Sequence, residues 1–217
     1  IMTYLVENDQ AKDVVIRYNT NLSMVERRKI KLYDLLPHFK RVQICASIDG
    51  VGKIGEYVRT GLRWDSWINN FKKGLFLNEK YGDYGISFDL TVTSPGLFSI
   101  KDMIDVTMEL DVHTLIKTTF SFDSTIIMSP MMIPRHILDP ILDDIIEYAT
   151  EKAKINPKIQ NYVECFLDIK SKKTFEEEYD DWQDGIRNGK EQMKKTDIYR
   201  NNPDTLNEIF SENDELI

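Results

Sequence analysis

Hydroxyl, amide and carboxylate side chains recur in this sequence just after short apolar, β-branched stretches. They occupy residues 19–21, 47–50, 91–94 and 129–130. In parallel α/β proteins, ligands bind beyond the carboxyl ends of the strands. Such side chains can hydrogen-bond the hydroxyls and the amino acid head group of a ligand. The sequence therefore predicts a ligand site along this rim, and its candidate residues are Asn19, Asn21, Ser47, Asp49, Thr91 and Thr93.

Arg59 supplies a cation for such a site, because its planar guanidinium can bind a carboxylate through two parallel hydrogen bonds. Five of these candidates also have a purely structural interpretation. Ser47 and Asp49 can close a turn through local backbone hydrogen bonds, and residues 19–21 are common turn formers. Arg59 can be an ordinary surface ion-pair partner. The residue types alone leave both interpretations open.

The elements that must position this rim alternate between strand and helix. Strand character, with turn formers at the ends, is found at 13–19, 41–48, 85–93 and 112–120, with a further strand-like run at 125–128. Helical periodicity is found up to residue 11 and at 22–40, 52–61, 64–77 and 101–110, the last with Ser99 as its expected cap. This alternation predicts βαβ units and a parallel sheet. The predicted fold class is α/β, and because a closed barrel needs more strands than these, the parallel sheet is either open or part of a barrel that lacks its first units.

From Pro134 onward the pattern is helical only. Helices are expected at 135–154 and 156–172, and then in an acidic stretch from residue 174 that Gly185 and Gly189 interrupt. The carboxylates of that stretch fit a solvated helix start. The sequence thus predicts two parts, which are a barrel segment at 1–133 and a helical C-terminal extension at 134–217.

The most specific pattern begins at the second predicted strand. Residues 44–50 read I-C-A-S-I-D-G and are followed by E-Y-V-R at 56–59 and W-D-S-W at 64–67. This order resembles the fourth strand and following helix of radical S-adenosylmethionine (SAM) enzymes, especially the branch with SPASM or twitch extensions. Three further segments resemble the third, fifth and sixth strands of that family, at 17–21, 89–93 and 120–134. The resemblance covers about residues 3–150, and Leu22 stands where the family's third strand ends in glycine.

The resemblance implies both a fold and a role. The fold is a partial barrel of the radical SAM type, in which Ser47 and Asp49 contact the ribose of SAM and Arg59 pairs with its carboxylate. The other rim candidates would lie beside them. A complete enzyme of this family cleaves SAM reductively to a 5′-deoxyadenosyl radical. This chain is therefore expected to supply the SAM-binding side of such an enzyme, acting on a substrate that the sequence does not identify.

The iron–sulfur side of such a site is missing from this sequence. The family holds a [4Fe–4S] cluster with the thiolates of a CxxxCxxC loop. This chain has only Cys45 and Cys165, each expected to be a buried small hydrophobe, and it also lacks the family's G-G-E segment. We therefore expect an inactive fragment whose cluster loop lies upstream. The first residue, Ile1, agrees with truncation, although Met2 could be a true start.

Two alternatives to the enzyme fragment remain open. The first is a cluster-free barrel scaffold that acts as a binding or partner protein. The second is a different parallel α/β enzyme that uses the same rim for a phosphate or sugar ligand, although no glycine-rich phosphate-binding loop follows any predicted strand.

Charge and composition argue against several other functions. The chain has 28 basic and 36 acidic side chains, and the net charge of −8 disfavours a general nucleic-acid footprint. The densest basic stretch, residues 27–31, is expected to be the solvated face of a helix. His38, His113 and His136 lack the spacing of a metal pair. No apolar run is long enough for a membrane span and the two cysteines suggest no disulfide framework, so a soluble cytoplasmic protein is expected.

Overall fold

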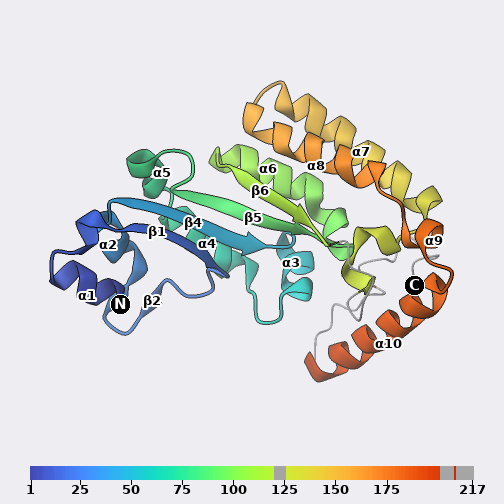
Figure 1. The fold of residues 1–217 in the computed structure, drawn as a ribbon, viewed down its shortest axis with the longest axis horizontal. Helices are drawn as coiled ribbons and strands as arrows, with labels where there is room; N and C mark the ends of the chain where they lie inside the picture. The colour runs from blue at the N-terminus through green and yellow to red at the C-terminus, as the bar shows by residue number, and fades with distance from the viewer. Residues whose placement is uncertain (120–125, 201–207, 209–217) are drawn as a thin grey trace.

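The computed structural model describes residues 1–119, 126–200 and 208. Its centre is a four-stranded sheet in the order β1-β4-β5-β6 (Figure 1). The strands are β1 (Val15–Thr20), β4 (Arg41–Ile48), β5 (Ile86–Val92) and β6 (Thr114–Thr118). All three pairings between them are parallel. The predicted α/β class, with helices alternating with the strands of a parallel sheet, is confirmed.

Helices occupy most of the connections between strands. The α-helices are α1 (Met2–Glu7), α2 (Leu32–Leu35), α3 (Gly52–Val58), α4 (Trp64–Lys73), α5 (Phe76–Tyr81), α6 (Ile100–Leu110), α7 (Arg135–Ala153), α8 (Gln160–Ser171), α9 (Phe175–Glu178) and α10 (Trp182–Arg200). The 3-10 turns are η1 (Ala11–Asp13), η2 (Leu36–His38), η3 (Pro95–Ser99), η4 (Ile126–Met128), η5 (Pro130–Met132) and η6 (Pro157–Ile159). None of the described helices combines the length and the apolar character needed to cross a membrane.

The two faces of the sheet differ in chemistry because successive residues of a strand point to opposite sides. In β5, Ile86, Phe88 and Leu90 alternate with polar residues and are fully buried. The register places Ile86 beside Ile44 of β4, so the apolar side chains of neighbouring strands share one face. The polar residues therefore gather on the opposite face.

Helices that follow β4, β5 and β6 cover the apolar face. Phe71 of α4 packs against Phe88, with ring centroids 4.3 Å apart. Thr114 of β6 lies beside Phe88 in the register, and its hydroxyl is 3.1 Å from the hydroxyls of Thr107 in α6 and Tyr162 in α8. The helices α4, α6 and α8 therefore pack on the same side of the sheet.

The C-terminal helices predicted after Pro134 are present. α7 packs against α6 and α8, and α8 also contacts β6. One hydrophobic cluster includes Leu90 of the sheet, Leu142 of α7 and Phe166 of α8, so buried packing continues across the predicted division at residue 133. α10 runs through Gly185 and Gly189 without the predicted interruption. A single glycine costs a helix only about 1 kcal/mol, which neighbouring helical residues can offset.

The predicted helix at 22–40 is wrong over its first part, and only α2 and η2 at its end are helical. β2 (Glu26–Arg27) and β3 (Ile30–Lys31) form a small antiparallel hairpin there, before the short helix α2. Arg28 adopts a φ of 57°, a left-handed conformation that occurs in tight turns and not in a right-handed helix. The basic residues 27–31 are exposed, as the sequence predicted, but they belong to this hairpin.

Two helix limits also differ from the prediction. The helix expected at 64–77 divides near Gly74 into α4 and α5. Ser99 precedes α6 but makes no capping hydrogen bond with its side chain. Its hydroxyl donates to Gly96 O at 3.1 Å and accepts from Val51 N at 3.2 Å. The serine is therefore used in tertiary packing between η3 and α3.

The strand-like run predicted at 125–128 is wrong where the structure describes it. Residues 126–128 form the 3-10 turn η4, whose Met128 O accepts a hydrogen bond from Ser94 N at 3.0 Å. This bond ties the turn to the segment that follows β5. Residues 120–125, including the predicted end of the preceding strand at Phe120, lie outside the described part of the chain.

Candidate functional site

The polar residues of β4, β5 and β6 lie together on the sheet face opposite the hydrophobic core. Ser47 is the register partner of Asp89, and Thr91 is the partner of Lys117. Register partners in parallel strands point to the same side of the sheet. Polar side chains from three strands therefore meet near the carboxyl ends of those strands, where the sequence predicted a ligand rim.

Asp89 is the centre of this group. Its side chain is only 8% exposed, and Lys117 Nζ lies 2.9 Å and 2.8 Å from its two carboxylate oxygens. Ser47 Oγ donates a hydrogen bond to Asp89 Oδ2 at 3.2 Å. The Lys117 side chain is 53% exposed, so the buried carboxylate is paired with an ammonium that reaches solvent. That ammonium retains donor capacity for a ligand.

Sequence reasoning did not select Asp89 or Lys117 as site residues. The signal for Asp89 was its position in β5, where Ser87, Asp89 and Thr91 alternate with core residues. An aspartate inside a buried strand is rare unless it is paired, so it predicts a cationic partner nearby. The identity of that partner depends on the register between β5 and β6, which the sequence pattern does not give.

Asp49 and Arg59, which were both predicted to contact SAM, contact each other. Arg59 Nη2 lies 3.2 Å from Asp49 Oδ1, and Arg59 Nε pairs with Oδ2. The Asp49 side chain is 8% exposed and the Arg59 side chain is 28% exposed. Asp49 therefore occupies one edge of the guanidinium, and Nη1 lies on the other. Among the described residues, the polar contacts of this guanidinium are all with Asp49.

Close backbone packing holds the turn that carries Asp49. A Cβ atom on Gly55 of α3 would lie 2.2 Å from Gly50 O, and one on Gly96 of η3 would lie 2.5 Å from Asp49 O. Only glycine allows an approach this close without displacing the backbone. The turn after β4 is thus fixed between α3 and η3. Arg59, the C-cap residue directly after α3, is thereby brought within reach of Asp49.

Asn21 and Thr93 have local partners. Asn21 Oδ1 accepts hydrogen bonds from Ser23 N at 3.3 Å and from Ser23 Oγ at 2.9 Å. Thr93 Oγ1 accepts from Gly96 N at 3.1 Å and is buried. Both residues therefore act as turn formers after β1 and β5, which is the structural interpretation that the sequence offered for Asn21.

Thr91 and Asn19 lie on the polar face at different places. Thr91 is half-buried beside Lys117, so it belongs to the group around Asp89. Asn19 is exposed on β1 and pairs in register with Cys45, two residues before Ser47 on β4. The structure thus brings Ser47 and Thr91 close to the Asp89–Lys117 pair and leaves Asn19 on the outer strand β1.

The two cysteines lie apart from each other, Cys45 on β4 and Cys165 on α8. Among the described residues, no three His, Cys, Asp or Glu side chains are grouped in a way that could hold a metal ion. Cys45 is buried in β4, as predicted. Cys165 is half-buried on α8, with its Sγ 3.8 Å from Thr118 Oγ1, and burial raises the pKa of its thiol. The residues of this chain therefore do not fit a [4Fe–4S] cluster, which needs thiolate ligands.

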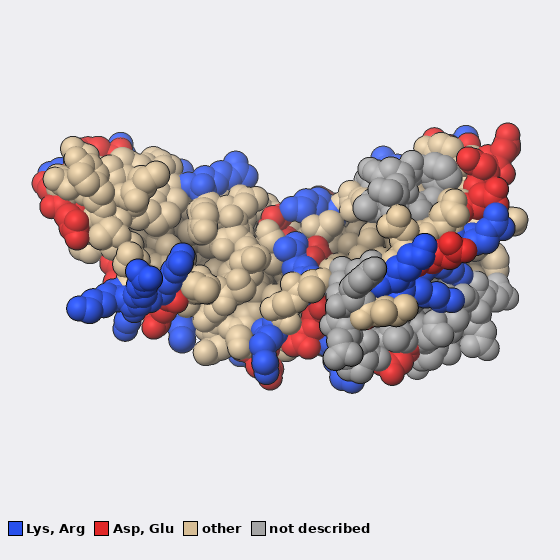
Figure 2. All heavy atoms as spheres, turned by 90° about the horizontal axis from the view of Figure 1, so that it is seen from below, with Lys and Arg blue, Asp and Glu red and all other residues tan. Residues whose placement is uncertain are grey.

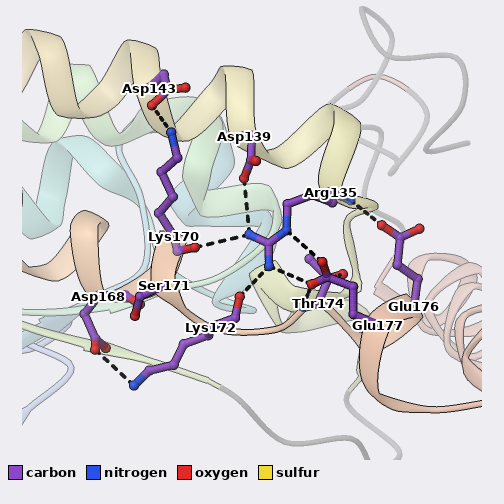
Figure 3. A network of polar contacts seen from close by, with 10 residues as sticks. All are labelled: Arg135, Asp139, Asp143, Asp168, Lys170, Ser171, Lys172, Thr174, Glu176 and Glu177. Atoms are coloured by element: carbon purple, nitrogen blue, oxygen red, sulfur yellow. Dashed lines mark hydrogen bonds and ion pairs between the residues drawn. The ribbon is translucent and has the colours of Figure 1, made fainter.

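A second charged network joins the C-terminal helices around Arg135 at the start of α7 (Figure 3). Its guanidinium donates to the backbone oxygens of Lys170 and Lys172, and Nη1 lies 3.2 Å from Asp139 Oδ1. Nε and Nη2 both donate to the Glu177 carboxylate, at 3.4 Å and 2.7 Å. All three guanidinium nitrogens therefore bind protein acceptors.

The acidic run in this network is structural as well as solvated. Thr174 and Glu177 form a capping box at the start of α9, and Glu176 Oε1 accepts from Arg135 N. Hydrogen bonds from Arg135 and then from the Thr174 backbone lower the pKa of Glu177 to about 2. The prediction of a solvated helix start for residues 176–178 missed these contacts, because Arg135 is distant in sequence.

Comparison of the chain with protein-family models, with curated proteins and with solved structures gave no match. A functional conclusion must therefore come from the residues and their geometry. The most informative features are the two carboxylate–cation pairs at the carboxyl ends of the strands, Asp49 with Arg59 and Asp89 with Lys117.

Proposed function

We propose that this chain supplies the SAM-binding side of a radical SAM enzyme, with the iron–sulfur loop on a preceding part of the protein. The observation that carries this proposal is the Asp49–Arg59 pair in the S-I-D-G turn after β4, because it presents a half-occupied guanidinium at the carboxyl end of a parallel sheet. Such an edge is where ligands of α/β proteins bind. A guanidinium edge suits the carboxylate of an amino acid ligand.

The order of the strands favours a barrel segment over an open doubly wound sheet. In a barrel, strands follow one another in sequence order and the helices cover only the outside. In a doubly wound sheet, the order reverses and helices cover both faces. Here the strands run in sequence order, and α4, α6 and α8 share one face. In the proposal, the polar face is the inner wall of a partial barrel of the radical SAM type.

The contacts of each residue suggest its part in SAM binding. Asp49 holds the Nε and Nη2 edge of Arg59, so it acts as a positioning residue and leaves the Nη1 edge for the SAM carboxylate. Ser47 donates a hydrogen bond from its hydroxyl to Asp89, and the lone pairs of the hydroxyl oxygen can accept a hydrogen bond from a ribose hydroxyl. Lys117 compensates the buried charge of Asp89. The thiolate ligands of an iron–sulfur cluster would come from the preceding part of the protein, since this chain has only two cysteines.

A binding titration tests the proposal. The purified chain, free of iron, is titrated with SAM and separately with adenosine, which has the ribose and base but no carboxylate. SAM should bind, and Arg59→Lys should weaken it about tenfold, because lysine keeps the charge and loses the planar fork. Adenosine affinity should stay the same in both proteins. Equal loss for both ligands would remove Arg59 from carboxylate binding.

The coding DNA ahead of the Ile1 codon offers an independent test. An in-frame CxxxCxxC motif upstream is the expected result, because three thiolates must come from another part of the protein. A stop codon immediately upstream would contradict the enzyme-fragment proposal.

A second candidate function is a cluster-free scaffold that binds a ligand or a partner protein. It is favoured by one observation, which is that Arg59 and Lys117 both have carboxylate partners within the chain and so need no ligand for charge balance. Absence of binding by SAM or any nucleotide-like ligand at millimolar concentration would favour this scaffold.

A further inference from the structure

A pocket of about 470 Å³ lies between α10 and the segment around η5. Cavities of this size hold small ligands. The pocket belongs to the side of the molecule toward which the strands point, since η4 and η5 follow β6 and η4 is tied to the segment after β5. In Figure 1 the strand arrows point toward the end of the molecule where α9 and α10 lie.

The pocket has an apolar part formed by two segments that are distant in sequence. Met132 and Pro134 come from η5 and the start of α7, and Trp182 and Ile186 come from the first turns of α10. Met132 is fully buried, and the other three are half-buried. Apolar surface of this kind gains free energy when a hydrocarbon or aromatic group displaces water from it.

The charged part of the pocket comes from α10. Among the lining residues Arg187, Lys190 and Lys194 are basic, and Glu191 is acidic. Arg187 already pairs with Asp184. The side chains along α10, seen from below, include a group of Lys and Arg (Figure 2). The pocket therefore has an excess of positive charge beside its apolar surface.

Lys190 lies on the face of α10 that turns toward the protein. Trp182 and Ile186 lie eight and four positions before Lys190, and Met193 lies three positions after it. These spacings place all of them on the same face of the helix. Lys190 is half-buried, and burial, with a smaller contribution from Lys194, lowers its pKa. Within the described part of the chain, Lys190 has no hydrogen-bond or ion-pair partner. A desolvated ammonium without a counterion is unfavourable, so an entering anion would be stabilised there.

We propose that this pocket binds a small anion that carries an apolar body, with a carboxylate or phosphate as its charged group. The apolar body would pack on Met132, Pro134, Trp182 and Ile186, and the anion would pair with Lys190. Two independent features support this ligand class, namely the apolar lining and the half-buried lysine, which has no ion-pair partner among the described residues. The inference does not depend on SAM binding, because none of the lining residues belongs to the site around Asp49 and Asp89.

Methyl NMR of the full chain tests the proposal with three probes that share one hydrocarbon chain: octanoate, octyl phosphate and neutral 1-octanol. The methyl signals of Met132 and Ile186 report binding in the pocket. Octanoate or octyl phosphate should shift them at concentrations about tenfold or more below those needed for 1-octanol. Comparison of the two anions then identifies the preferred head group.

A pair of variants locates the charge that matters. Lys190→Gln should weaken binding of the anionic probe about tenfold or more and leave 1-octanol unchanged. Lys195→Gln is the matched control, because Lys195 is an exposed lysine of α10 outside the pocket lining, and it should change neither. Far-ultraviolet circular dichroism verifies that both variants keep their helices.

Three results would overturn the inference. The first is that neither octanoate nor octyl phosphate binds more tightly than 1-octanol. The second is that Lys190→Gln leaves the affinity for the anionic probe unchanged. The third is that none of the three probes shifts the methyl signals of Met132 and Ile186. Each of these can occur whether or not SAM binds, so the two proposals fail separately.

Discussion

Arg59 and Arg135 are both partly buried arginines that bind carboxylates, but they use their guanidinium groups differently. Arg135 engages all three of its nitrogens with two side chains and two backbone oxygens, and so joins α7, α8 and α9 (Figure 3). Arg59 engages two nitrogens with a single carboxylate, Asp49. The first arginine is saturated by its own chain, and the second keeps one edge without a partner among the described residues.

The difference separates a structural arginine from one that can bind a ligand. A saturated guanidinium offers an incoming anion no donor without breaking existing bonds. A guanidinium that a buried carboxylate orients from one side keeps a fixed pair of N–H donors for a ligand. We therefore expect substitution of Arg135 to change mainly stability, and substitution of Arg59 to change binding as well.

Arg135→Ala should have the largest effect on stability. The substitution leaves Lys170 O and Lys172 O without this donor and removes the cation beside Glu177. We expect the free energy of unfolding to fall by about 3 kcal/mol, measured by urea denaturation at neutral pH. A loss below about 0.5 kcal/mol would show that this network is solvated and dispensable, and the comparison between the two arginines would fail.

Arg59→Ala should cost less stability, about 2 kcal/mol, because it leaves the partly exposed arginine's partner Asp49 without its cation but removes contacts to that one carboxylate only. Adding Asp49→Asn to this variant removes the buried charge and should recover most of the loss. The comparison of both single variants with the double variant in urea measures this coupling. If the double variant is as unstable as the sum of the single variants, the pair is not energetically coupled.

Acid should weaken the Arg135 network through Glu177. The folded-state pKa of Glu177 is about 2, lowered from an ordinary value of 4.5, so its stabilisation is fully present above about pH 4.5 and is lost as the pH falls toward 2. Because the side chain is 40% exposed, solvent screening limits the effect to about 1 kcal/mol. Urea midpoints should fall between about pH 5 and about pH 3, and Glu177→Gln should reduce that fall. An identical pH dependence in Glu177→Gln would assign the acid effect to other groups.

Lys72→Ala is the smallest change and serves as a control for the ion pairs. Lys72 Nζ lies 3.0 Å from Glu109 Oε1, and both side chains are well exposed. An exposed pair of this kind contributes little, so the free energy of unfolding should change by less than about 0.5 kcal/mol. A loss as large as that of Arg135→Ala would mean that burial does not explain the difference among these pairs.

Local pattern predicted the parallel strands better than the connections. β4 was predicted at 41–48 and is Arg41–Ile48, because its apolar residues and the Asp49–Gly50 turn are local signals. The segment at 22–40 was misread, because a two-residue hairpin turn at Arg28 and Lys29 interrupts a spacing of apolar residues that also fits a helix. The acidic run at 176–178 was placed correctly at a helix start, but its partner Arg135 was not foreseen.

The sequence alone indicated where the four strands of the parallel sheet lie, which of their residues are polar and that these polar residues come near the strand ends. These features depend on side-chain alternation and turn chemistry within a few neighbouring residues. The tertiary structure decided which polar groups meet. Asp89 pairs with Lys117 because β5 and β6 adopt one register, and Asp49 pairs with Arg59 because Gly55 and Gly96 let α3 and η3 pack tightly on the turn after β4. Such pairings depend on packing between segments that are distant in sequence, and local periodicity does not contain that information.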